Sequence, residues 1–434
     1  MENILSKTEV MENQGKPGYK KTKLGWLPED WKVKKFDSVF RFIANYSFSR
    51  ANLETVELNT DDFFNIHYGD IHSKYELENL DFSKESKALR ITDFRKKIKS
   101  EDLLKEGDLI IADASEDYEG VCDSIEILNI GNYKITGGLH TFIARDKNGL
   151  TEPGFRSFIL KNPPVHKILK RIATGISVYG VSKTNLSKIE IPIPTSDEQT
   201  AIASIIHKWD RAIIKHENLL ERKTSYKKGL MQQLLTGKKR LPGFSGEWKQ
   251  RKLGFYLREY NLKVGIDEQY EVLTSAREGL IKQSEYYNSG RISEKKIEGF
   301  NIIPPGFITY RSRSDDKSFK FNLNYYNLTG CVSKYYPVFS STIDTNFFYY
   351  FLNYNNRYLS RYAVGSSQLV LSFKELSNVR LSLPEDKEQI AISNILLSAD
   401  KEIELIKKKK ELLQNQKRGL MQQLLTGIKR LRTN

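Results

Sequence analysis

The stretch "KKGLMQQLLTGKKRL" (Lys227–Leu241) occurs a second time, almost unchanged, as "KRGLMQQLLTGIKRL" (Lys417–Leu431). The two copies agree at thirteen of fifteen positions and lie 190 residues apart. The same offset extends upstream, where "IEIPIPTSDEQTAIASII" (Ile189–Ile206) matches "VRLSLPEDKEQIAISNIL" (Val379–Leu396). The chain therefore contains one scaffold segment twice.

Each copy of the segment predicts a short extended run followed by a helix. In the first copy, Pro194 stops the extended run, Ser196 can accept the first free amide protons, and Gln199 can complete a capping box. The second copy repeats the pattern from Pro384 onward. The helices should therefore begin just after the two prolines.

Apolar residues recur along both helices at alternating four- and three-residue steps, which is the period of a coiled coil. About 40 residues at a rise of 1.5 Å give a rod of roughly 60 Å, and each copy is the natural partner of the other. The alternative is that each helix packs separately on a globular core, although helices of that kind are usually shorter. The predicted seam and docking positions are Ile202, Ile206, Trp209, Ile213, Leu230, Leu234, Ile392, Leu396, Ile403, Ile406, Leu420 and Leu424.

Each predicted helix contains one glycine and ends at another. Gly237 and Gly427, both followed by basic residues, predict a left-handed stop whose cations complement the helix dipole. Gly229 and Gly419 lie inside the helices, where each costs about 1 kcal/mol relative to alanine. Close approach of another backbone is the predicted reason for these two interior glycines.

The bulk composition indicates an anionic partner. The chain has 434 residues, more than one hydrophobic core usually supports, and 69 Lys plus Arg against 54 Asp plus Glu leave a net charge of +15. That charge favours nucleic acid or an anionic membrane surface, but no apolar run of membrane-spanning length and no signal pattern is present, which predicts a cytoplasmic protein without a membrane contact. Two cysteines and scattered histidines predict neither a disulfide framework nor a metal site.

Two blocks of unrelated sequence separate the repeated segments. A tryptophan segment precedes each block, "WKVKKF" (Trp31–Phe36) and "WKQRKL" (Trp248–Leu253). Each block places a strand after a glycine turn, in "GDLIIADAS" (Gly107–Ser115) and "GFITYRSRSDDKSF" (Gly306–Phe319), so both are predicted as mixed α+β modules. The predicted segments are a flexible extension at 1–24, a first globular domain at 25–195, a first long helix at 196–237, a second domain with its linker at 238–385, a second long helix at 386–427 and a tail at 428–434.

Basic residues alternate with aromatic residues in both blocks. Arginine and lysine neutralise phosphates, and arginine can also read base edges in the major groove. One such run is more often a solvated face, so the prediction of DNA binding depends on the paired arrangement. The predicted contacts are Lys84, Lys87, Arg90 and Arg95 in the first block, and Arg277, Lys282, Arg291, Arg311 and Arg313 in the second.

One short motif favours an enzyme, although two adjacent prolines commonly mark only a turn. "NPPV" (Asn162–Val165) resembles the Asn-Pro-Pro-aromatic element with which amino-methylating DNA methyltransferases hold a flipped base. Its fourth residue is valine, and the chain has no glycine-rich loop for a methyl donor, no P-loop and no visible nucleophile with a companion base. The sequence therefore predicts no catalytic residues in this chain.

The whole pattern resembles the specificity subunit of type I restriction-modification enzymes. The residues that carry the resemblance are the two "P…EQ.AI" helices, the two "LLTG..R" ends, and "TGISV" and "VGSSQ" before each extended run. The resemblance covers the chain from about Trp26 to Leu431. It also marks Lys183, Gln368 and Lys374, beside the Gly-Ser stretches, as phosphate-binding candidates.

The resemblance implies an α+β fold in which two globular target recognition domains are separated by an antiparallel pair of long coiled-coil helices with pseudo-twofold symmetry. Each domain would read one half of an asymmetric bipartite sequence in double-stranded DNA. The helices would set the gap and dock two modification subunits, which bind S-adenosylmethionine and methylate adenine. Restriction subunits using ATP and Mg would join the complex, while this chain would hold no cofactor and do no chemistry.

Two functions of other classes remain as alternatives. A self-sufficient methyltransferase or nuclease would need a methyl-donor loop or clustered carboxylates with a lysine, and neither is evident. A coiled-coil assembly protein with incidental basic charge would bind DNA weakly and without sequence preference.

Overall fold

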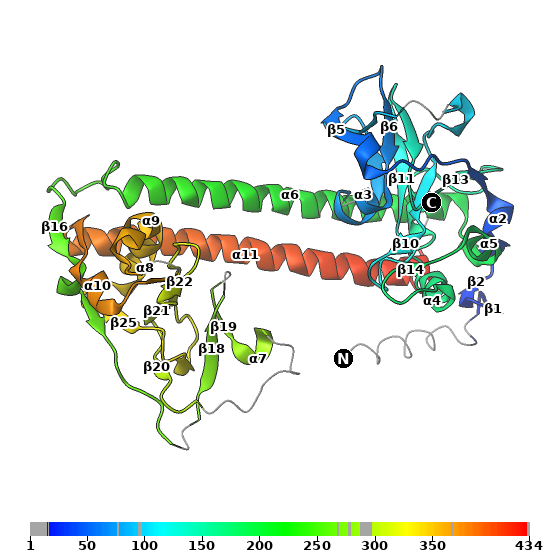
Figure 1. Ribbon diagram of the computed structural model, residues 1–434. Helices are drawn as coiled ribbons and strands as arrows, with labels where there is room; N and C mark the ends of the chain where they lie inside the picture. The colour runs from blue at the N-terminus through cyan, green and yellow to red at the C-terminus, as the bar shows by residue number, and fades with distance from the viewer. Residues whose placement is uncertain are drawn as a thin grey trace. The chain divides into compact units, whose positions relative to one another are not determined.

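The computed structural model describes residues 15, 17–75, 78–93, 98–266, 269–276, 279–286, 297–365 and 368–431. The chain divides into two compact units, Met1–Lys215 with Lys410–Asn434 (unit 1), and His216–Lys409 (unit 2). Both units mix helices with short strands, which confirms the predicted α+β class, and each contains one of the variable blocks (Figure 1).

Two sheets form the centre of unit 1. The larger has the strand order β4 (Phe40–Ile43), β13 (Thr141–Asp146), β9 (Leu109–Ala112), β11 (Ser124–Asn129) and β7 (Asn79–Asp81). The smaller has the order β12 (Lys134–Gly137), β6 (Phe63–Ile66), β8 (Lys87–Ile91) and β5 (Leu53–Glu57). All four residues of β9 are buried because alternate side chains enter two different apolar cores. This is the strand that the sequence predicted after Gly107.

Short helices and paired strands surround these sheets. The helices are α2 (Phe36–Val39), α3 (Tyr68–Ser73), α4 (Pro163–Ile172) and α5 (Lys183–Lys188), with 3-10 turns at Arg50–Asn52, Ser100–Asp102 and Arg156–Phe158. The strand pairs are β3 (Lys32–Lys35) with β15 (Glu190–Ile193), and β10 (Ala114–Ser115) with β14 (Tyr179–Gly180).

Part of the predicted flexible extension at 1–24 is ordered. Residues Tyr19–Thr22 form β1, which pairs antiparallel with β2 (Gly25–Pro28). Leu24 in the turn and Leu27 are buried in the core of unit 1, and Gly25 adopts φ +100°. The polar composition concealed a hairpin because only its turn and its second strand supply apolar residues.

Unit 2 also contains two four-stranded sheets. One has the order β17 (Leu257–Glu259), β25 (Val338–Ser341), β21 (Ile308–Tyr310) and β23 (Phe321–Leu323). The other has the order β19 (Leu280–Lys282), β18 (Glu271–Ser275), β24 (Gly330–Val332) and β20 (Asn301–Ile303). The remaining elements are β16 (Lys249–Lys252) paired with β27 (Arg380–Leu383), β22 (Arg313–Ser314) paired with β26 (Leu369–Val370), helices α7 (Gln283–Tyr286), α8 (Thr345–Tyr354), α9 (Asn356–Leu359) and α10 (Phe373–Asn378), and 3-10 turns at Leu253–Phe255 and Ser360–Tyr362.

The two long helices are α6 (Ser196–Leu234) and α11 (Asp386–Leu425), which confirms the predicted pair. Their starts differ from the predicted capping box. Gln199 donates its side-chain amide to Pro194 O at 2.9 Å and to Leu150 O at 3.1 Å, and the Ser196 hydroxyl donates to Glu152 Oε1 at 2.5 Å. The prediction was wrong because the glutamine is buried and fastens the helix start to the domain.

Within each unit the helix segments run antiparallel. In unit 1, Leu424 near the end of α11 packs in the same core as Ile202 near the start of α6, while Lys417 Nζ lies 2.6 Å from Asp210 Oδ1 further along. In unit 2, Lys227 Nζ lies 2.5 Å from Asp400 Oδ1. These two ion pairs join the same positions of the repeat with the roles of the helices exchanged, as pseudo-twofold symmetry requires.

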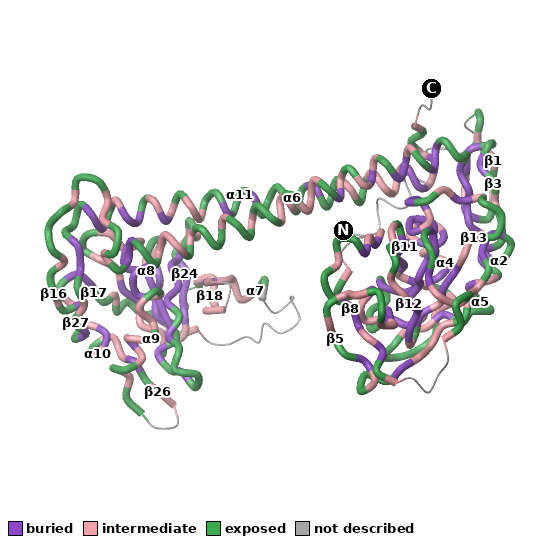
Figure 2. Tube along the Cα trace, turned by 90° about the horizontal axis from the view of Figure 1, so that it is seen from above, coloured by how far each residue is buried: buried purple, intermediate pink, exposed green. Residues whose placement is uncertain are grey.

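Buried residues alternate with exposed ones along both helices (Figure 2). Trp209, Ile213, Leu230 and Leu420 are half-buried, and the other predicted seam positions, Ile202, Ile206, Leu234, Ile392, Leu396, Ile403, Ile406 and Leu424, are buried.

The four repeat glycines divide into two kinds. Gly237 and Gly427 have φ values of +68° and +72°, which confirms the predicted left-handed stops. Gly229 and Gly419 were expected to allow close backbone approach, but among the described residues no atom lies within 4 Å of a Cβ built at either position. Packing against the described residues therefore does not explain the interior glycines.

A buried carboxylate joins the start of one long helix to the segment after the other. In unit 1, Glu198 is 2% exposed and accepts from Trp31 Nε1 at 2.7 Å and Arg430 Nε at 2.7 Å. Arg430 also pairs with Asp30 at 2.7 Å. The tryptophan of one repeat and the arginine of the other therefore share one glutamate.

Unit 2 repeats this arrangement. Glu388 is 1% exposed and accepts two hydrogen bonds of 2.7 Å from Arg240 and one of 3.2 Å from Trp248 Nε1. Removing a carboxylate from water costs several kcal/mol. The bidentate bond from the Arg240 guanidinium offsets this cost for the buried Glu388 carboxylate.

We expect Arg240→Ala to destabilise unit 2 by about 3 kcal/mol, the lower end for breaking a buried ion pair, because the remaining Glu388 carboxylate loses its charge partner. Urea unfolding of the full chain would measure the change. Lys239→Ala removes a neighbouring exposed cation and should change stability by less than about 0.5 kcal/mol. Equal effects of the two substitutions would contradict the expectation.

Candidate nucleic-acid interface

Both units contain the same small ladder of two strands. In unit 1, β10 pairs with β14 so that Ala114 faces Gly180. In unit 2, β22 pairs with β26 so that Arg313 faces Val370. The loops that lead into β14 and β26 are the "TGISV" and "VGSSQ" stretches, so the ladders are common to two otherwise different blocks.

A strained glycine turns each of these loops. Gly175 has φ +135°, and a Cβ there would lie 1.8 Å from Val178 O. Gly365 has φ +127°, and a Cβ there would lie 2.2 Å from Gln368 O. A side chain at either position would therefore clash with the backbone carbonyl it faces, Val178 O in unit 1 and Gln368 O in unit 2.

The loops present apolar side chains to solvent. Ile176 is 95% exposed and Val178 is 48% exposed in unit 1. In unit 2, Val364 is 65% exposed at the base of the loop, where it pairs with Val370. An isoleucine this exposed adds nothing to the core, and apolar side chains of this kind contact bases or their methyl groups in DNA grooves.

We expect Gly175→Ala to lower DNA affinity by about 5- to 150-fold, because a loop strain of 1–3 kcal/mol must be relieved by moving the tip. Gly149 provides a matched control, since it has φ +62° with no atom of the described residues within 4 Å of an added Cβ. Fluorescence anisotropy with a labelled duplex would compare the two variants. An equal loss of affinity in Gly149→Ala would show that general strain, not loop position, causes the effect.

The basic residues predicted to contact DNA in block one differ in their exposure and in their ion pairing. Lys84 is exposed and pairs with Asp81 at 2.7 Å, which holds the pKa of that carboxyl at about 2. Lys87 is also exposed. Arg90 pairs with Glu54 at 2.5 Å and with Asp62 at 3.4 Å across its sheet, so its charge is already matched. Arg95 lies outside the described residues.

Lys183 belongs to a different surface from the candidates on β8. It follows β14 at the start of α5, with its Nζ 5.0 Å from the ring centroid of Phe42 and 5.6 Å from that of Phe142. Lys87 and Arg90 lie on β8 in the separate four-stranded sheet. The structure therefore does not unite the predicted contacts of block one in a single element.

Four candidates of block two converge on one ladder. Arg311 and Arg313 are exposed around β22, and Gln368 precedes β26 and donates to Asp315 Oδ1 at 3.0 Å. Lys374 is exposed on α10, directly after this ladder. Lys282 lies on β19, 3.6 Å from Glu285. Arg277 and Arg291 lie outside the described residues.

Exposed aromatic side chains also lie beside the ladders and were not among the residues predicted from the sequence. Tyr118 is 44% exposed, and its ring centroid lies 5.1 Å from that of Tyr179 on β14. Tyr335 is 52% exposed, and its ring lies 4.8 Å from the Arg313 guanidinium carbon. Tyr118 follows β10 by three residues and could have been found by extending the strand "LIIADAS".

The asparagine of the "NPPV" motif has a structural role. Asn162 is 2% exposed, accepts from the Val165 amide at 3.4 Å as the cap of α4, and donates to Leu425 O at the end of α11. Its polar atoms are therefore engaged in fixing a helix start to the repeat segment.

Other chemistry-bearing groups give no reactive cluster. Across the described ranges no three His, Cys, Asp or Glu side chains are grouped so as to hold a metal ion. Burial raises the pKa of the Cys122 and Cys331 thiols to about 12, so both stay protonated at neutral pH. In the part of the chain that the structure describes, no helix has the length and apolar character needed to cross a membrane.

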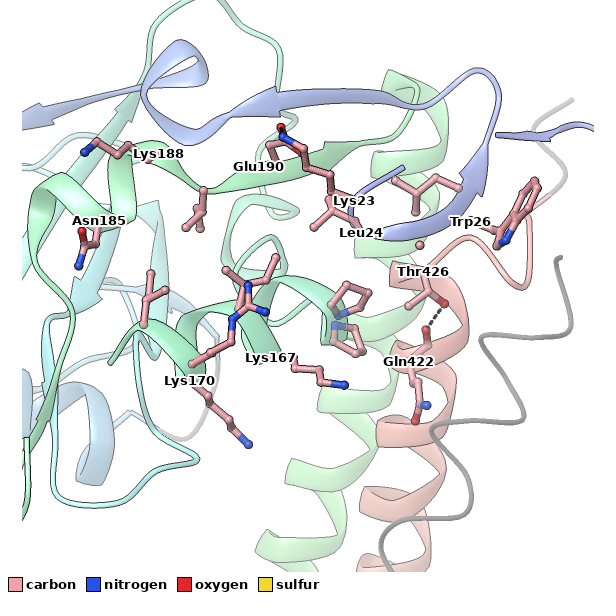
Figure 3. A pocket seen from close by; sticks show the side chains of 18 of the residues that line it. Lys23, Leu24, Trp26, Lys167, Lys170, Asn185, Lys188, Glu190, Gln422 and Thr426 are labelled. Carbon is pink, nitrogen blue, oxygen red and sulfur yellow. Dashed lines mark hydrogen bonds and ion pairs between the residues drawn. The ribbon is translucent and has the colours of Figure 1, made fainter. Parts of the chain in front are cut away.

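Unit 1 also has a hollow of about 1250 Å³ between the β1–β2 hairpin, α4, α5 and the end of α11 (Figure 3). Its wall includes Leu24, Trp26 and Ile168, and Lys167 and Lys188 lie at its edge. An apolar floor with a cationic rim is suited to a protein segment with apolar and acidic residues.

The family model for the type I restriction modification DNA specificity domain matches residues 28–222 and 271–415. The chain is 23% identical over 436 residues to the putative type I restriction enzyme MjaX specificity subunit of Methanocaldococcus jannaschii, across 96% of this chain and 97% of that protein. It is 24% identical to the MjaVIII specificity subunit of the same organism, across 92% and 93% of the two chains. The crystal structure of a type I restriction-modification S subunit from M. genitalium shares the fold, with a TM-score of 0.52 and 14% identity over 91% of this chain and 96% of that one.

Proposed function

We propose a function from one established premise: this chain belongs to the family of type I restriction-modification DNA specificity subunits. In the proposal, unit 1 and unit 2 each read one half of an asymmetric bipartite target in double-stranded DNA. The observation that carries it is the two-stranded ladder and the glycine before it, which both units share while the side chains on the ladders differ. Two domains that recognise different half-sites need the same backbone arrangement to bind DNA, but different side chains to contact different bases.

The chain itself does no chemistry in this proposal. The one motif that favoured methyl transfer uses its asparagine to cap α4 and bond the end of α11. S-adenosylmethionine would bind to a modification subunit, and ATP and Mg to a restriction subunit. The chain would contribute sequence recognition and a docking surface to the complex.

Two modification subunits would dock along the repeated helices and their flanks. The interior glycines Gly229 and Gly419 support this, because each lowers helix propensity by about 1 kcal/mol at a position where none of the described residues makes a close contact. A close-packed partner helix would supply the reason. The hollow of unit 1 supports the same arrangement with its apolar floor and basic rim.

We expect Gly419→Leu to weaken assembly with the modification subunit at least tenfold, because a bulky side chain would block a closely packed partner. Gly419→Ala is the matched control and should raise helix stability by about 1 kcal/mol. Size-exclusion chromatography of the mixed subunits would report assembly. Normal assembly by the leucine variant would place the docking surface elsewhere.

Co-expression tests the whole proposal. The chain should bind duplex DNA but methylate nothing alone, and adenine methylation should appear only when its modification subunit is present. Sequencing-based mapping of methylated adenines should then give two half-sites with a fixed gap. Methylation by the isolated chain, or methylation without a bipartite consensus, would exclude the proposed function.

A further inference from the structure

The two ladders can be aligned residue by residue from their hydrogen bonds. In unit 1 the amide of Val181 donates to Asp113 O at 3.0 Å. In unit 2 the amide of Leu371, 190 positions after Val181, donates to Ser312 O at 2.9 Å. Asp113 and Ser312 are therefore equivalent positions, and the residues on either side of them can be compared directly.

The flanking positions carry opposite chemistry in the two units. In unit 2 they are Arg311 and Arg313, which are both exposed. In unit 1 they are Ala112 and Ala114, which are 0% and 6% exposed. Unit 2 therefore presents two exposed arginines at positions where unit 1 has two buried alanines.

Buried residues on either side of the arginines hold the segment that runs from β21 into β22. Tyr310, Ser312 and Ser314 alternate with the arginines and are buried. The Tyr310 hydroxyl donates to Leu371 O at 2.9 Å, and the Ser312 hydroxyl donates to Tyr335 O at 2.6 Å. Arg313 lies on β22, where successive side chains point to opposite faces, so the buried Ser314 leaves Arg313 on the exposed face. Arg311 lies between β21 and β22 and is also exposed.

Both guanidinium groups are available for a ligand. Among the described residues, no carboxylate lies within ion-pairing distance of Arg311 or Arg313, unlike Arg90 of unit 1, which pairs with Glu54. The ring of Tyr335 lies under the Arg313 guanidinium at 4.8 Å, which orients that group without neutralising it. An oriented and unpaired arginine on a DNA-reading domain has the properties of a base-reading side chain.

We infer that Arg311 and Arg313 are the guanine-reading residues of unit 2, and that the half-site recognised by unit 2 contains a guanine contacted by each. The inference rests on the proposed function. The paired N–H groups of arginine match the O6 and N7 acceptors of guanine in the major groove, and alanine methyl groups cannot replace them. The half-site of unit 1 therefore lacks guanine contacts from this ladder.

The test begins with the target itself. The wild-type chain, assembled with its modification subunit, selects its sequence from a library of random duplexes. Each guanine of the unit 2 half-site is then replaced by 7-deazaguanine, which keeps base pairing but removes the N7 acceptor. At two of these guanines the wild-type complex should lose about 5- to 150-fold in affinity, the range of one specific base contact.

Arginine variants connect each guanine to its side chain. Arg311→Ala and Arg313→Ala should each lose discrimination at one guanine and become insensitive to 7-deazaguanine there, and Arg313→Lys should keep the charge without restoring discrimination. Arg251→Ala is a control, because Arg251 of unit 2 also stacks on an aromatic ring, that of Phe255 at 4.9 Å, but lies on β16. Arg251→Ala should keep the full guanine preference.

Two results would overturn the inference while leaving the proposed function intact. One is an unchanged bipartite consensus in both alanine variants. The other is an equal loss of affinity for all duplexes with 7-deazaguanine sensitivity retained, which would make the arginines phosphate contacts. Failure of the wild-type complex to select any bipartite sequence would instead refute the proposed function.

Discussion

Replacing Lys417 with methionine is expected to destabilise unit 1 by about 3–5 kcal/mol, the largest stability effect of any single substitution considered for this chain. The Lys417 ammonium lies 2.6 Å from Asp210 Oδ1 and 3.0 Å from Glu78 Oε2, and its side chain is 12% exposed. Methionine keeps the packing volume but leaves two buried carboxylates with one fewer cation. Because Lys417 lies on α11 and Asp210 on α6, the loss should loosen the helix pair within unit 1.

The pH dependence gives the prediction a second readout. Burial alone would raise the pKa of Glu78, but Lys161 and Lys417 hold it at about 2. A folded pKa below the ordinary 4.5 contributes stability that is complete above pH 4.5 and is lost as pH falls toward 2. Burial raises the pKa of Asp210, which shares Lys417 with Glu78 and has no second lysine. In the variant both carboxyls should titrate higher, so its deficit should grow as pH rises toward neutrality.

Lys227→Met is the matched control, because Lys227 is the same position in the other repeat. Lys227 lies 2.5 Å from Asp400, whose side chain is 36% exposed and also accepts from the Tyr350 hydroxyl at 2.5 Å. Water and the tyrosine can solvate that carboxylate, so the loss should be about 1 kcal/mol. Urea unfolding from pH 5 to 8 would compare the variants. Equal losses, or a pH-independent deficit in Lys417→Met, would contradict the role of burial.

The repeated sequence predicted the two long helices, but it did not predict the roles of the Glu-Gln pair that is identical in both copies. Gln199 was predicted to complete a capping box with Ser196, whereas its amide donates to the carbonyl of Pro194. Glu198 received no predicted role, although it accepts from Trp31 and Arg430. Trp31 and Arg430 are 399 positions apart, so no local pattern connects them. Their meeting depends on which helix ends pack together, which is information that only the tertiary fold contains.

The predicted DNA contacts could not be ranked from the sequence for a related reason. Arg90 and Arg313 are both arginines on short strands among aromatic residues, and the sequence does not distinguish them. The antiparallel register places Glu54 directly opposite Arg90, whereas Arg313 lies opposite Val370. Composition predicts where basic residues gather, but strand register decides which of them keep an unmatched charge.

Lengthening both long helices by one heptad should move the methylated half-sites apart by about three base pairs. Seven residues add about 10 Å of helix, and the rise of B-DNA is about 3.4 Å per base pair. The insertions would follow Lys215 in α6 and Lys409 in α11, where each helix passes from one unit to the other. A heptad preserves the seam, so the pairs Lys417–Asp210 and Lys227–Asp400 can both still form.

The position of methylation is the decisive measurement in this experiment, because affinity will fall for an independent reason. Three added base pairs rotate one half-site by about 100° around the duplex relative to the other, while a heptad barely rotates the helix seam. DNA must therefore twist to reach both units. A heptad in α6 alone serves as the control, since it shifts Lys227 out of register with Asp400 and should abolish methylation instead of moving it. If the double insertion kept the original gap, the helices would not determine the spacing of the target.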